Sequence, residues 1–337
     1  MAKIKGLCLA GVCSLLLALE GCVGQPAQEA GQEVSAQRKL QIAVVPKGST
    51  HYHWRSVQAG AEKAAHELGD VDIIWQGPQK EDDRQMQIQV VQNLISRGVD
   101  GLLLAPLDDQ SLVPPVKAAV NRSIPVVIFD SDLKTDVYDA FVATDNYAGG
   151  RLCAQRLAEV MGGKGKVIML KYSEGSEATL KREAGFLEAL KEYGPNIQVI
   201  SQNQFAGATF EKALQVSQNL LNRFGDFDGV FCSNETSTQG MLRALQVAGK
   251  TGKVKFVGFD MNQTLLAGIN NGEIHGLAVQ DPVAMGYIGV KTAHAIIHSE
   301  VYDKRVDTGV TMVHKGNLNE PNVQVLLNPE ISQLLKE

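Results

Sequence analysis

The residues best suited to chemistry follow short apolar runs, at the points where strands of a sheet would end. The first such loop, residues 46–54, carries Lys47, His51, His53 and Trp54. Later loops of the same kind carry Asp130, Ser131, Asn234, Asp260 and Gln280. Ligands of open parallel sheets bind outside the carboxyl ends of the strands. The pattern therefore predicts that these side chains lie around one cleft.

Two pairs of residues in these loops have a second interpretation. His51 and His53 could form half of a metal site, but no third ligand is near them in the sequence, so we expect a polar pocket or a surface loop. Asp130 and Asp132 could act as acid and base, yet Asp132 fits a turn or a solvent-facing position, which leaves Asp130 as the functional candidate. No hydrolase, metalloprotease or phosphate-loop motif is found, and no nucleophile has a base beside it. The sequence predicts a binding protein without metal or cofactor, and not an enzyme.

Three of the polar residues have local roles that compete with ligand binding. Asn234 precedes a predicted helix and is a natural N-cap, and Asp260 could cap the helix that follows it. Arg182 falls in the middle of a predicted helix, where an arginine ordinarily forms local ion pairs on a solvated face. From the residues alone, these alternatives stay open.

A framework of alternating strands and helices must position these residues. Apolar β-branched runs alternate with amphipathic stretches that often end at glycine. The predicted strands are 40–45, 71–75, 101–105, 126–129, 141–144, 166–170, 197–201, 229–233, 254–259 and 274–279. The predicted helices are 54–68, 83–97, 111–121, 147–161, 177–193, 209–224, 235–248 and 263–271. Units of this length imply right-handed crossovers, so we predict an α/β protein with two similar halves, each a mainly parallel sheet covered on both faces.

The N-terminal residues predict export. Two lysines precede an apolar run over residues 7–19, which is shorter than the ~20 residues that span a bilayer. The run ends at Leu19-Glu20-Gly21-Cys22, which is similar to a lipobox, so that residues 1–21 form a signal peptide and Cys22 carries a lipid. The alternative is an ordinary secretory signal in which Cys22 has no role. Residues 22–38 are polar and small, and we interpret them as a flexible tether.

Charge and cysteine content narrow the class further. The chain has a net charge of −5 with its basic residues scattered among acids, which argues against a nucleic-acid partner. About 300 residues follow the tether, which is enough for two lobes with separate cores. Cys153 and Cys232 are the two cysteines in this body. A disulfide between them is an open alternative in an oxidising compartment, but we favour two buried free thiols.

Six strings connect the chain to a known family. They are Gly60-Ala-Glu-Lys-Ala-Ala-His-Glu-Leu-Gly69, Phe129-Asp-Ser-Asp132, Ala143-Thr-Asp-Asn146 with Gly149-Gly150, Arg182-Glu-Ala-Gly-Phe186, Leu242-Arg-Ala-Leu-Gln-Val-Ala-Gly249 and Val257-Gly-Phe-Asp260. On these strings, the chain resembles the type I periplasmic binding proteins of ABC sugar importers, the ribose-, allose- and xylose-binding group, over essentially all of residues 39–327.

The resemblance implies two Rossmann-like lobes with parallel sheets, joined by a hinge that the chain crosses three times. The crossings are expected near residues 144–145, 280–281 and 308–309. The implied first lobe comprises residues 39–144 plus 281–307, with a helix over 284–297, and the second comprises residues 145–280 plus 308–337. Closure of the hinge around a ligand is the implied motion.

The resemblance also implies the ligand contacts. They are His51, His53, Trp54, Asp130 and Ser131 in the first lobe, Arg182, Asn234 and Asp260 in the second, Gln280 at a crossing, and Lys47 as a further candidate. Acid, amide and guanidinium groups match adjacent hydroxyls, and Trp54 offers a stacking face for a sugar ring. Ser131 and Ala208 depart from the ribose-type pattern, which argues for a sugar other than ribose, and Lys47 suggests a modified or acidic ligand.

For function, the resemblance implies a substrate-binding lipoprotein of an ABC-type importer. It would capture a monosaccharide or related polyol by hinge closure and deliver it to the transmembrane permease subunits. The alternative is a ligand sensor of the same fold that feeds a chemoreceptor, a histidine kinase or a quorum-signal pathway. We expect a monomer that is anchored by its lipid to a membrane, in the periplasm or at the cell surface.

Overall fold

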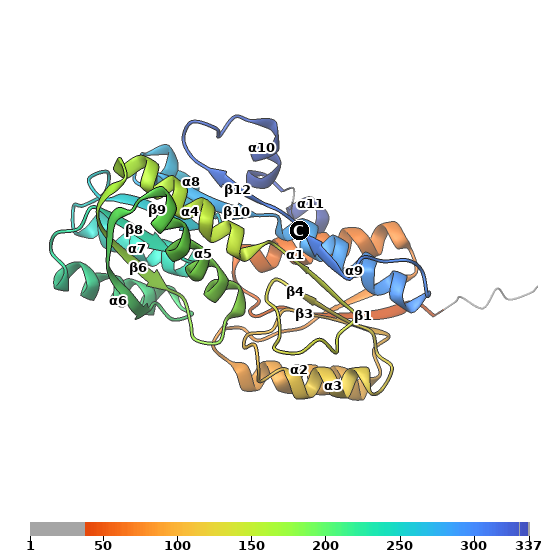
Figure 1. The fold of residues 1–337 in the computed structure, drawn as a ribbon. Coiled ribbons are helices and arrows are strands. Elements are labelled where there is room, and N and C mark those ends of the chain that lie inside the picture. Colours follow the sequence, from red (N-terminus) through yellow and green to blue (C-terminus); the bar gives the residue numbers. More distant parts are fainter. Residues whose placement is uncertain (1–37, 330, 336–337) are drawn as a thin grey trace, which may run out of the picture. The chain divides into compact units, whose positions relative to one another are not determined.

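The computed structural model describes residues 38–329 and 331–335, which form two six-stranded sheets flanked by helices (Figure 1). We call each sheet with its helices a lobe. The predictions of a signal peptide, of a lipid on Cys22 and of most of the tether fall on residues 1–37, outside the described residues. None of the described helices is long and apolar enough to cross a membrane.

The first lobe has a fully parallel sheet with the strand order β11-β5-β4-β3-β1-β2. Its strands are β1 (Leu40–Val45), β2 (Val71–Trp75), β3 (Gly101–Leu104), β4 (Val126–Phe129), β5 (Ala140–Ala143) and β11 (Arg305–Asp307). Its helices are α1 (Tyr52–Leu68), α2 (Arg84–Arg97), α3 (Val113–Val120) and α9 (Pro282–Ile297). Alternate side chains of β1 face opposite sides: Ile42 and Val44 pack with α1 and α9, whereas Ala43 and Val45 pack with α2 and α3. Both faces of this sheet are therefore buried.

The second lobe has the strand order β12-β10-β9-β8-β6-β7, with β12 antiparallel to β10 and the other pairs parallel. Its strands are β6 (Lys164–Lys171), β7 (Asn196–Phe205), β8 (Gly229–Cys232), β9 (Lys255–Phe259), β10 (Gly276–Gln280) and β12 (Val310–Val313). Its helices are α4 (Asn146–Met161), α5 (Glu177–Tyr193), α6 (Phe210–Arg223), α7 (Glu235–Val247), α8 (Gln263–Asn270) and α10 (Pro321–Leu327). Cys153 belongs to α4 and lies in the core between this helix, α5 and the sheet, and Cys232 lies in the core on the other face of the sheet. Both thiols are buried and free, which confirms the favoured prediction.

The chain passes between the two sheets three times. It leaves the first sheet after β5 and enters α4, returns from β10 to α9, and crosses again between β11 and β12. The first two crossings end in the same way, because Asp145 and Asp281 each cap the helix that follows. Each carboxylate accepts a backbone N–H at 2.9 Å, from Ala148 and Ala284 respectively.

Three features of the fold differ from the sequence predictions. The sequence does not predict β11 or β12, and β11 shows the reason: it has three residues, and Arg305 and Asp307 at its ends are exposed. β7 continues to Phe205, beyond the predicted end at residue 201. The assignment of all residues 308–337 to the second lobe is wrong for α11 (Ile331–Leu335), which packs against α1 of the first lobe.

Glycines bring two helices of each lobe into close contact. A side chain on Gly60 of α1 would collide with the carbonyl oxygen of Val283 in α9, and one on Gly286 of α9 would collide with that of Val57 in α1. In the second lobe, Gly150 of α4 and Gly185 of α5 make the same reciprocal contact. Figure 1 shows α1 beside α9. Since only a residue without Cβ fits at these points, each helix pair is packed backbone to backbone and forms a rigid side of its lobe.

Candidate ligand-binding site

A cavity of about 40 Å³ lies between the two lobes, beside the carboxyl ends of strands from both sheets. Nine predicted contacts line it: Lys47, His51, His53, Trp54, Asp130, Arg182, Asn234, Asp260 and Gln280. Six residues that the sequence analysis did not select also line it: Glu81, Tyr172, Ser176, Ala178, Thr179 and Glu235. Ligand pockets are typically ~300–1,000 Å³, so a small molecule enters only if the two lobes move apart.

Two buried aspartates reach the cavity from equivalent places in the two lobes. Asp130 follows β4 and Asp260 follows β9, and each backbone N–H donates to the next strand, at Val142 and Ala278 respectively. Both residues have a left-handed backbone, with φ of 62° and 65°. Aspartate tolerates this conformation better than most residues, and it is often found at functional sites. The two lobes thus present one carboxylate each to the same cavity.

Asp130 is held by two basic side chains of its own lobe. Lys47 Nζ lies 2.5 Å from Asp130 Oδ2, and His53 Nε2 lies 3.2 Å from Oδ1. Burial alone would raise the pKa of Asp130, but the charge of Lys47 and the interaction with His53 outweigh it and hold the pKa well below its ordinary value. The pKa of His53 is raised, because its contact with Asp130 outweighs the effect of burial. Asp130 is therefore ionised and already paired.

Ser131 does not line the cavity, although the sequence analysis selected it as a ligand contact. Its hydroxyl oxygen accepts a hydrogen bond from Lys47 Nζ at 2.5 Å and another from the backbone N–H of Ala178 in the second lobe at 3.3 Å. Ser131 thus positions Lys47 and joins the two lobes. The neighbouring Asp132 is not solvent-facing as expected, because Arg305 and Tyr138 bind its carboxylate.

Arg182 is buried, so its interpretation as a solvated helix residue is wrong. Only 3% of the residue is exposed, and the guanidinium lies 3.8 Å from the centre of the Phe259 ring. Nε donates to Asn146 Oδ1 at 2.8 Å, and Nη1 donates to the carbonyl oxygen of Ser233 at 3.1 Å. Nη1 also lies 3.6 Å from Asp260 Oδ2. The side chain therefore reaches the cavity with a fixed orientation.

The two predicted helix caps behave differently. Asn234 caps α7, because its side chain accepts from Ser237 N–H, and it lines the cavity as well. Asp260 does not cap α8, since Asn262 occupies that position. The carboxylate of Asp260 accepts instead from Gln280 Nε2 at 2.6 Å and from the backbone N–H of Glu235 at 3.2 Å.

Glu81 is the most connected of the residues that the sequence analysis missed. Its carboxylate lies 2.8 Å from His51 Nδ1 and accepts hydrogen bonds from the Trp54 indole N–H and, across the lobes, from the Tyr172 hydroxyl. Burial alone would raise the pKa of Glu81, but His51 and the two other donors lower it to about 2. Burial alone would lower the pKa of His51, but Glu81 raises it to about 9. Glu81 and His51 therefore form a charged pair.

Trp54 lines the cavity, but most of its indole lies in the core of the first lobe. The residue is 3% exposed, and its ring meets Phe129 edge-on with the ring centres 6.2 Å apart. The hydrogen bond to Glu81 fixes the direction of the indole. Its role as a stacking face stays a prediction. Ala208, where the sequence lacks an aromatic residue, is not among the lining residues.

Several buried polar atoms at the cavity have no hydrogen-bond partner within the described part of the chain. They are Glu235 Oε2, Gln280 Oε1, Ser176 Oγ and His53 Nε2, and the last of these has only its ion-pair contact with Asp130. The Gln280 amide oxygen can only accept hydrogen bonds. The Glu235 carboxylate also only accepts while it is ionised, and burial raises the pKa of Glu235. A buried polar atom without a partner costs ~1–3 kcal/mol, so a ligand that brings hydroxyl donors would remove this cost.

The two lobes also touch outside the cavity. Arg84 Nη2 donates to the carbonyl oxygen of Glu174 at 2.8 Å, and the backbone N–H of Asp109 donates to the carbonyl oxygen of Gly175 at 3.0 Å. The backbone N–H of Asp132 donates to Glu177 Oε2 at 3.1 Å. These bonds describe a closed arrangement, with the cavity between segments that follow strands of both sheets.

The missed residues carry a signal that is present in the sequence. Glu81 follows β2 and Tyr172 follows β6, so both belong to loops after strands, like Asp130 and Asp260. Ser176 and Thr179 lie at the start of α5, in the same loop region as Tyr172. Searching every loop after a strand for polar residues would have found Glu81 and Tyr172.

Known proteins with similar sequences or structures share this architecture. A family model described as "Periplasmic binding protein domain" matches residues 42–300. The chain is 30% identical over 292 residues to the ribose import binding protein of Bacillus subtilis (strain 168), which covers 86% of this chain and 93% of that protein. An ABC transporter solute binding protein from Agrobacterium vitis with bound D-fucose has 36% identity and a TM-score of 0.82, over 85% of this chain and 99% of that one. A carbohydrate transporter solute binding protein from Agrobacterium radiobacter in complex with D-arabinose has 32% identity and a TM-score of 0.83, over 87% and 100%. None of these relatives is named as an enzyme.

Proposed function

Because the chain belongs to the periplasmic binding protein domain family, we propose that it is a substrate-binding protein of an ABC-type importer. In this proposal it captures a monosaccharide or a related polyol between its lobes and delivers it to a permease. The observation that carries the proposal is the cavity, which draws charged and amide side chains from both lobes and leaves buried acceptor atoms unpaired. Adjacent hydroxyls donate and accept at once, so a polyol matches this lining.

The charges around the cavity favour a neutral ligand. Lys47 is engaged by Asp130 and Ser131, and Arg182 is engaged by Asn146 and Asp260. An acidic ligand would therefore compete with carboxylates that already bind these cations. The hydroxyls of a neutral sugar can insert between the partners, and charge-assisted hydrogen bonds to such groups are worth ~1.5–3 kcal/mol each. These contacts favour a neutral sugar over the acidic ligand that Lys47 suggests in the sequence.

Contacts of one ligand with both lobes would favour the closed arrangement over the open one. Ligand atoms that touch both Asp130 and Asp260 stabilise only the closed arrangement, since these residues belong to different lobes. A micromolar affinity corresponds to about −8 kcal/mol, which a few charge-assisted hydrogen bonds and ring packing can provide. Binding and release then need no covalent chemistry.

Family membership supports a location in the periplasm or an equivalent extracytoplasmic space. The finer part of the proposal is that Cys22 carries a lipid and that the chain works as a monomer held at a membrane surface. The support for it is the sequence from Leu19 to Cys22 and the polar tether that follows. Metabolic labelling with a fatty-acid analogue should mark the wild-type chain and leave Cys22→Ser unlabelled; equal labelling would contradict the anchor.

The test of the function is calorimetry of the full chain with a panel of neutral sugars and polyols. The panel contains D-fucose, D-arabinose, D-ribose, D-allose, xylitol and myo-inositol, with D-galacturonate as an acidic comparison. We expect at least one neutral member to bind. Asp260→Asn should then raise its Kd by about tenfold or more, because one charged acceptor is lost.

The matched control is Asp303→Asn, which changes an exposed aspartate outside the cavity. It should leave the Kd within about twofold. Failure of every neutral sugar and polyol to bind, or an Asp260→Asn variant that binds as tightly as wild type, would contradict the proposed function or its site. Preferential binding of the acidic sugar would overturn the neutral-ligand argument.

A further inference from the structure

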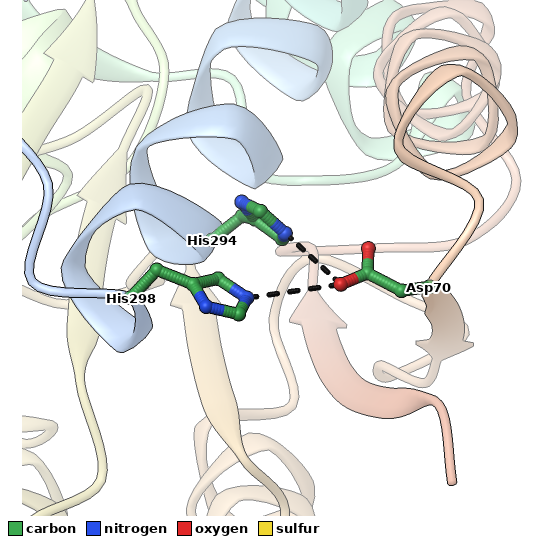
Figure 2. Close-up of side chains that lie close together, drawn as sticks. All are labelled: Asp70, His294 and His298. Atoms are coloured by element: carbon green, nitrogen blue, oxygen red, sulfur yellow. Dashed lines mark hydrogen bonds and ion pairs between the residues drawn. The ribbon is translucent and has the colours of Figure 1, made fainter. Parts of the chain in front are cut away.

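A second cluster of polar side chains lies on the first lobe, outside the cavity. It consists of Asp70, His294 and His298 (Figure 2). His294 Nε2 lies 3.3 Å from Asp70 Oδ2, and His298 Nε2 lies 3.7 Å from the same oxygen atom. Figure 2 shows both imidazoles on one helix and directed toward this oxygen. None of the three residues lines the cavity.

The local structure brings these three residues together without a long side chain. His294 and His298 are four residues apart at the end of α9, so they lie on the same face of the helix, with ring centres 4.3 Å apart. Gly69 ends α1 in a left-handed conformation, and Asp70 follows it directly before β2. The close packing of α1 against α9 through Gly60 and Gly286 sets the distance between these segments.

The three ligand atoms have the chemistry and spacing of a transition-metal site. Each residue offers one nitrogen or oxygen atom, and all three atoms lie within 4.8 Å of one another. Zinc binds histidine nitrogen and carboxylate oxygen at ~2.0–2.2 Å in a tetrahedron, whose ligand atoms are then ~3.4 Å apart. The distances of the two histidine nitrogens from Asp70, 3.3 and 3.7 Å, differ from that spacing by a few tenths of an ångström, and the two nitrogens lie within 4.8 Å of each other. Small side-chain rotations therefore suffice to bind an ion.

We propose that Asp70, His294 and His298 bind a divalent transition metal, with Zn²⁺ as the ion that fits best. Two imidazoles are borderline ligands, and together with one carboxylate oxygen they suit zinc better than Mg²⁺ or Ca²⁺, which prefer oxygen atoms alone. Water completes the tetrahedron, since His298 and Asp70 have side chains that are 43% and 49% exposed. The nearby Lys291 lies 3.4 Å from Glu67, so its charge is balanced by that carboxylate.

The position of the cluster separates it from the proposed transport function. α9 has 16 residues and begins at the crossing after Gln280, so its far end is about 24 Å from that crossing. A bound ion would join the end of α1 to the end of α9, and both helices belong to the first lobe. It would therefore stabilise one lobe and leave closure of the two lobes unchanged.

The experiment is a calorimetric titration of the full chain, first freed of metal by EDTA and dialysis, with ZnCl₂. We expect one ion per chain. Asp70→Asn, His294→Gln and His298→Gln should each weaken binding by roughly 10- to 100-fold or more, since even outer partners of a metal site change affinity by that factor. His66→Gln, an exposed histidine on α1 outside the cluster, should bind zinc like wild type.

The other outcomes overturn the inference. If the wild-type chain shows no saturable zinc binding, the three side chains only contact one another and the metal site does not exist. Zinc binding that persists in Asp70→Asn and His298→Gln but is lost in His53→Gln places the ion in the cavity. The proposed sugar binding is tested separately in the same variants: we expect the sugar Kd of Asp70→Asn within about twofold of wild type, so a failed metal site leaves the transport function standing.

Discussion

Replacing Tyr172 with phenylalanine removes one hydroxyl that joins the two lobes. The Tyr172 hydroxyl of the second lobe donates to the Glu81 carboxylate of the first lobe, at the edge of the cavity. Burial and the charge of Glu81 raise the pKa of Tyr172 well above its ordinary value, so the phenol keeps its proton and remains a donor. The bond exists only while the lobes are closed. Tyr172→Phe should therefore weaken ligand binding by destabilising the closed arrangement.

The size of the effect follows from the partners of Glu81. A hydrogen bond to a charged group contributes ~1.5–3 kcal/mol. Glu81 keeps His51 and Trp54 as donors after the substitution, so the lower end of this range applies. Since ~1.4 kcal/mol corresponds to a factor of ten, the Kd for the sugar should rise about tenfold.

Tyr138→Phe is the matched control for this measurement. The Tyr138 hydroxyl also donates to a carboxylate, that of Asp132, but both residues belong to the first lobe. Calorimetry should therefore show an unchanged sugar Kd for Tyr138→Phe, while thermal unfolding shows a loss of stability in both variants. If Tyr172→Phe binds the sugar within twofold of wild type, or if both variants lose affinity equally, the bond to Glu81 does not stabilise closure and the reasoning fails.

Three further predictions concern charges at the cavity. In Glu81→Gln, an NMR titration should show the His51 pKa fall from about 9 to 6.5 or below, because burial lowers it once the Glu81 charge is gone; an unchanged value would refute the pair. Because folding raises the pKa of His51 from 6.5 to about 9, its contribution to stability is complete below pH 6.5 and is lost as the pH rises through about 9. The lowered pKa of Glu81 makes its contribution complete above pH 4.5. As the pH rises from 6.5 through about 9, wild type should therefore lose more free energy of unfolding than Glu81→Gln. Arg182→Met should lower the free energy of unfolding in urea by ~3–5 kcal/mol, because the buried Asp260 carboxylate is left without the positive charge of Arg182. Lys181→Met, which changes an exposed residue of the same helix, should alter the free energy of unfolding by at most ~1 kcal/mol. Equal costs for the two would contradict the buried position of Arg182.

Strands and helices with strong local signals are predictable from the sequence alone. The β-branched run of β1 and the glycine after α1 lead to element bounds within two residues of those observed. β11 has no such signal, because its pairing with β5 is a contact between residues more than 160 positions apart. The strand exists through tertiary pairing, which no local pattern can show.

The residues of the candidate site likewise fall into those that local sequence predicts and those whose roles depend on distant segments. Asp130 was predictable, since it follows an apolar strand and lies where a ligand would bind, whereas Asp260, in the same kind of place, was predicted only with the family resemblance. Arg182 is different: its burial depends on Asn146, Ser233 and Phe259, which come from three other segments of the chain. Without the family resemblance, the spacing of residues on its own helix predicts a surface arginine. Glu81 likewise gains its role from His51, Trp54 and Tyr172, which local sequence cannot bring together.

The three crossings also determine the order in which the lobes can be completed during synthesis. α9 covers one face of the first sheet, and β11 forms its edge, yet both are made only after the entire β6–β10 region of the second lobe. The apolar face of the first sheet that α1 and α9 share is therefore only partly covered until residues 282–307 have emerged. Such late, long-range contacts slow folding. For a chain that is exported as proposed, slow folding keeps it unfolded, and so able to pass through the export machinery, until it has crossed the membrane.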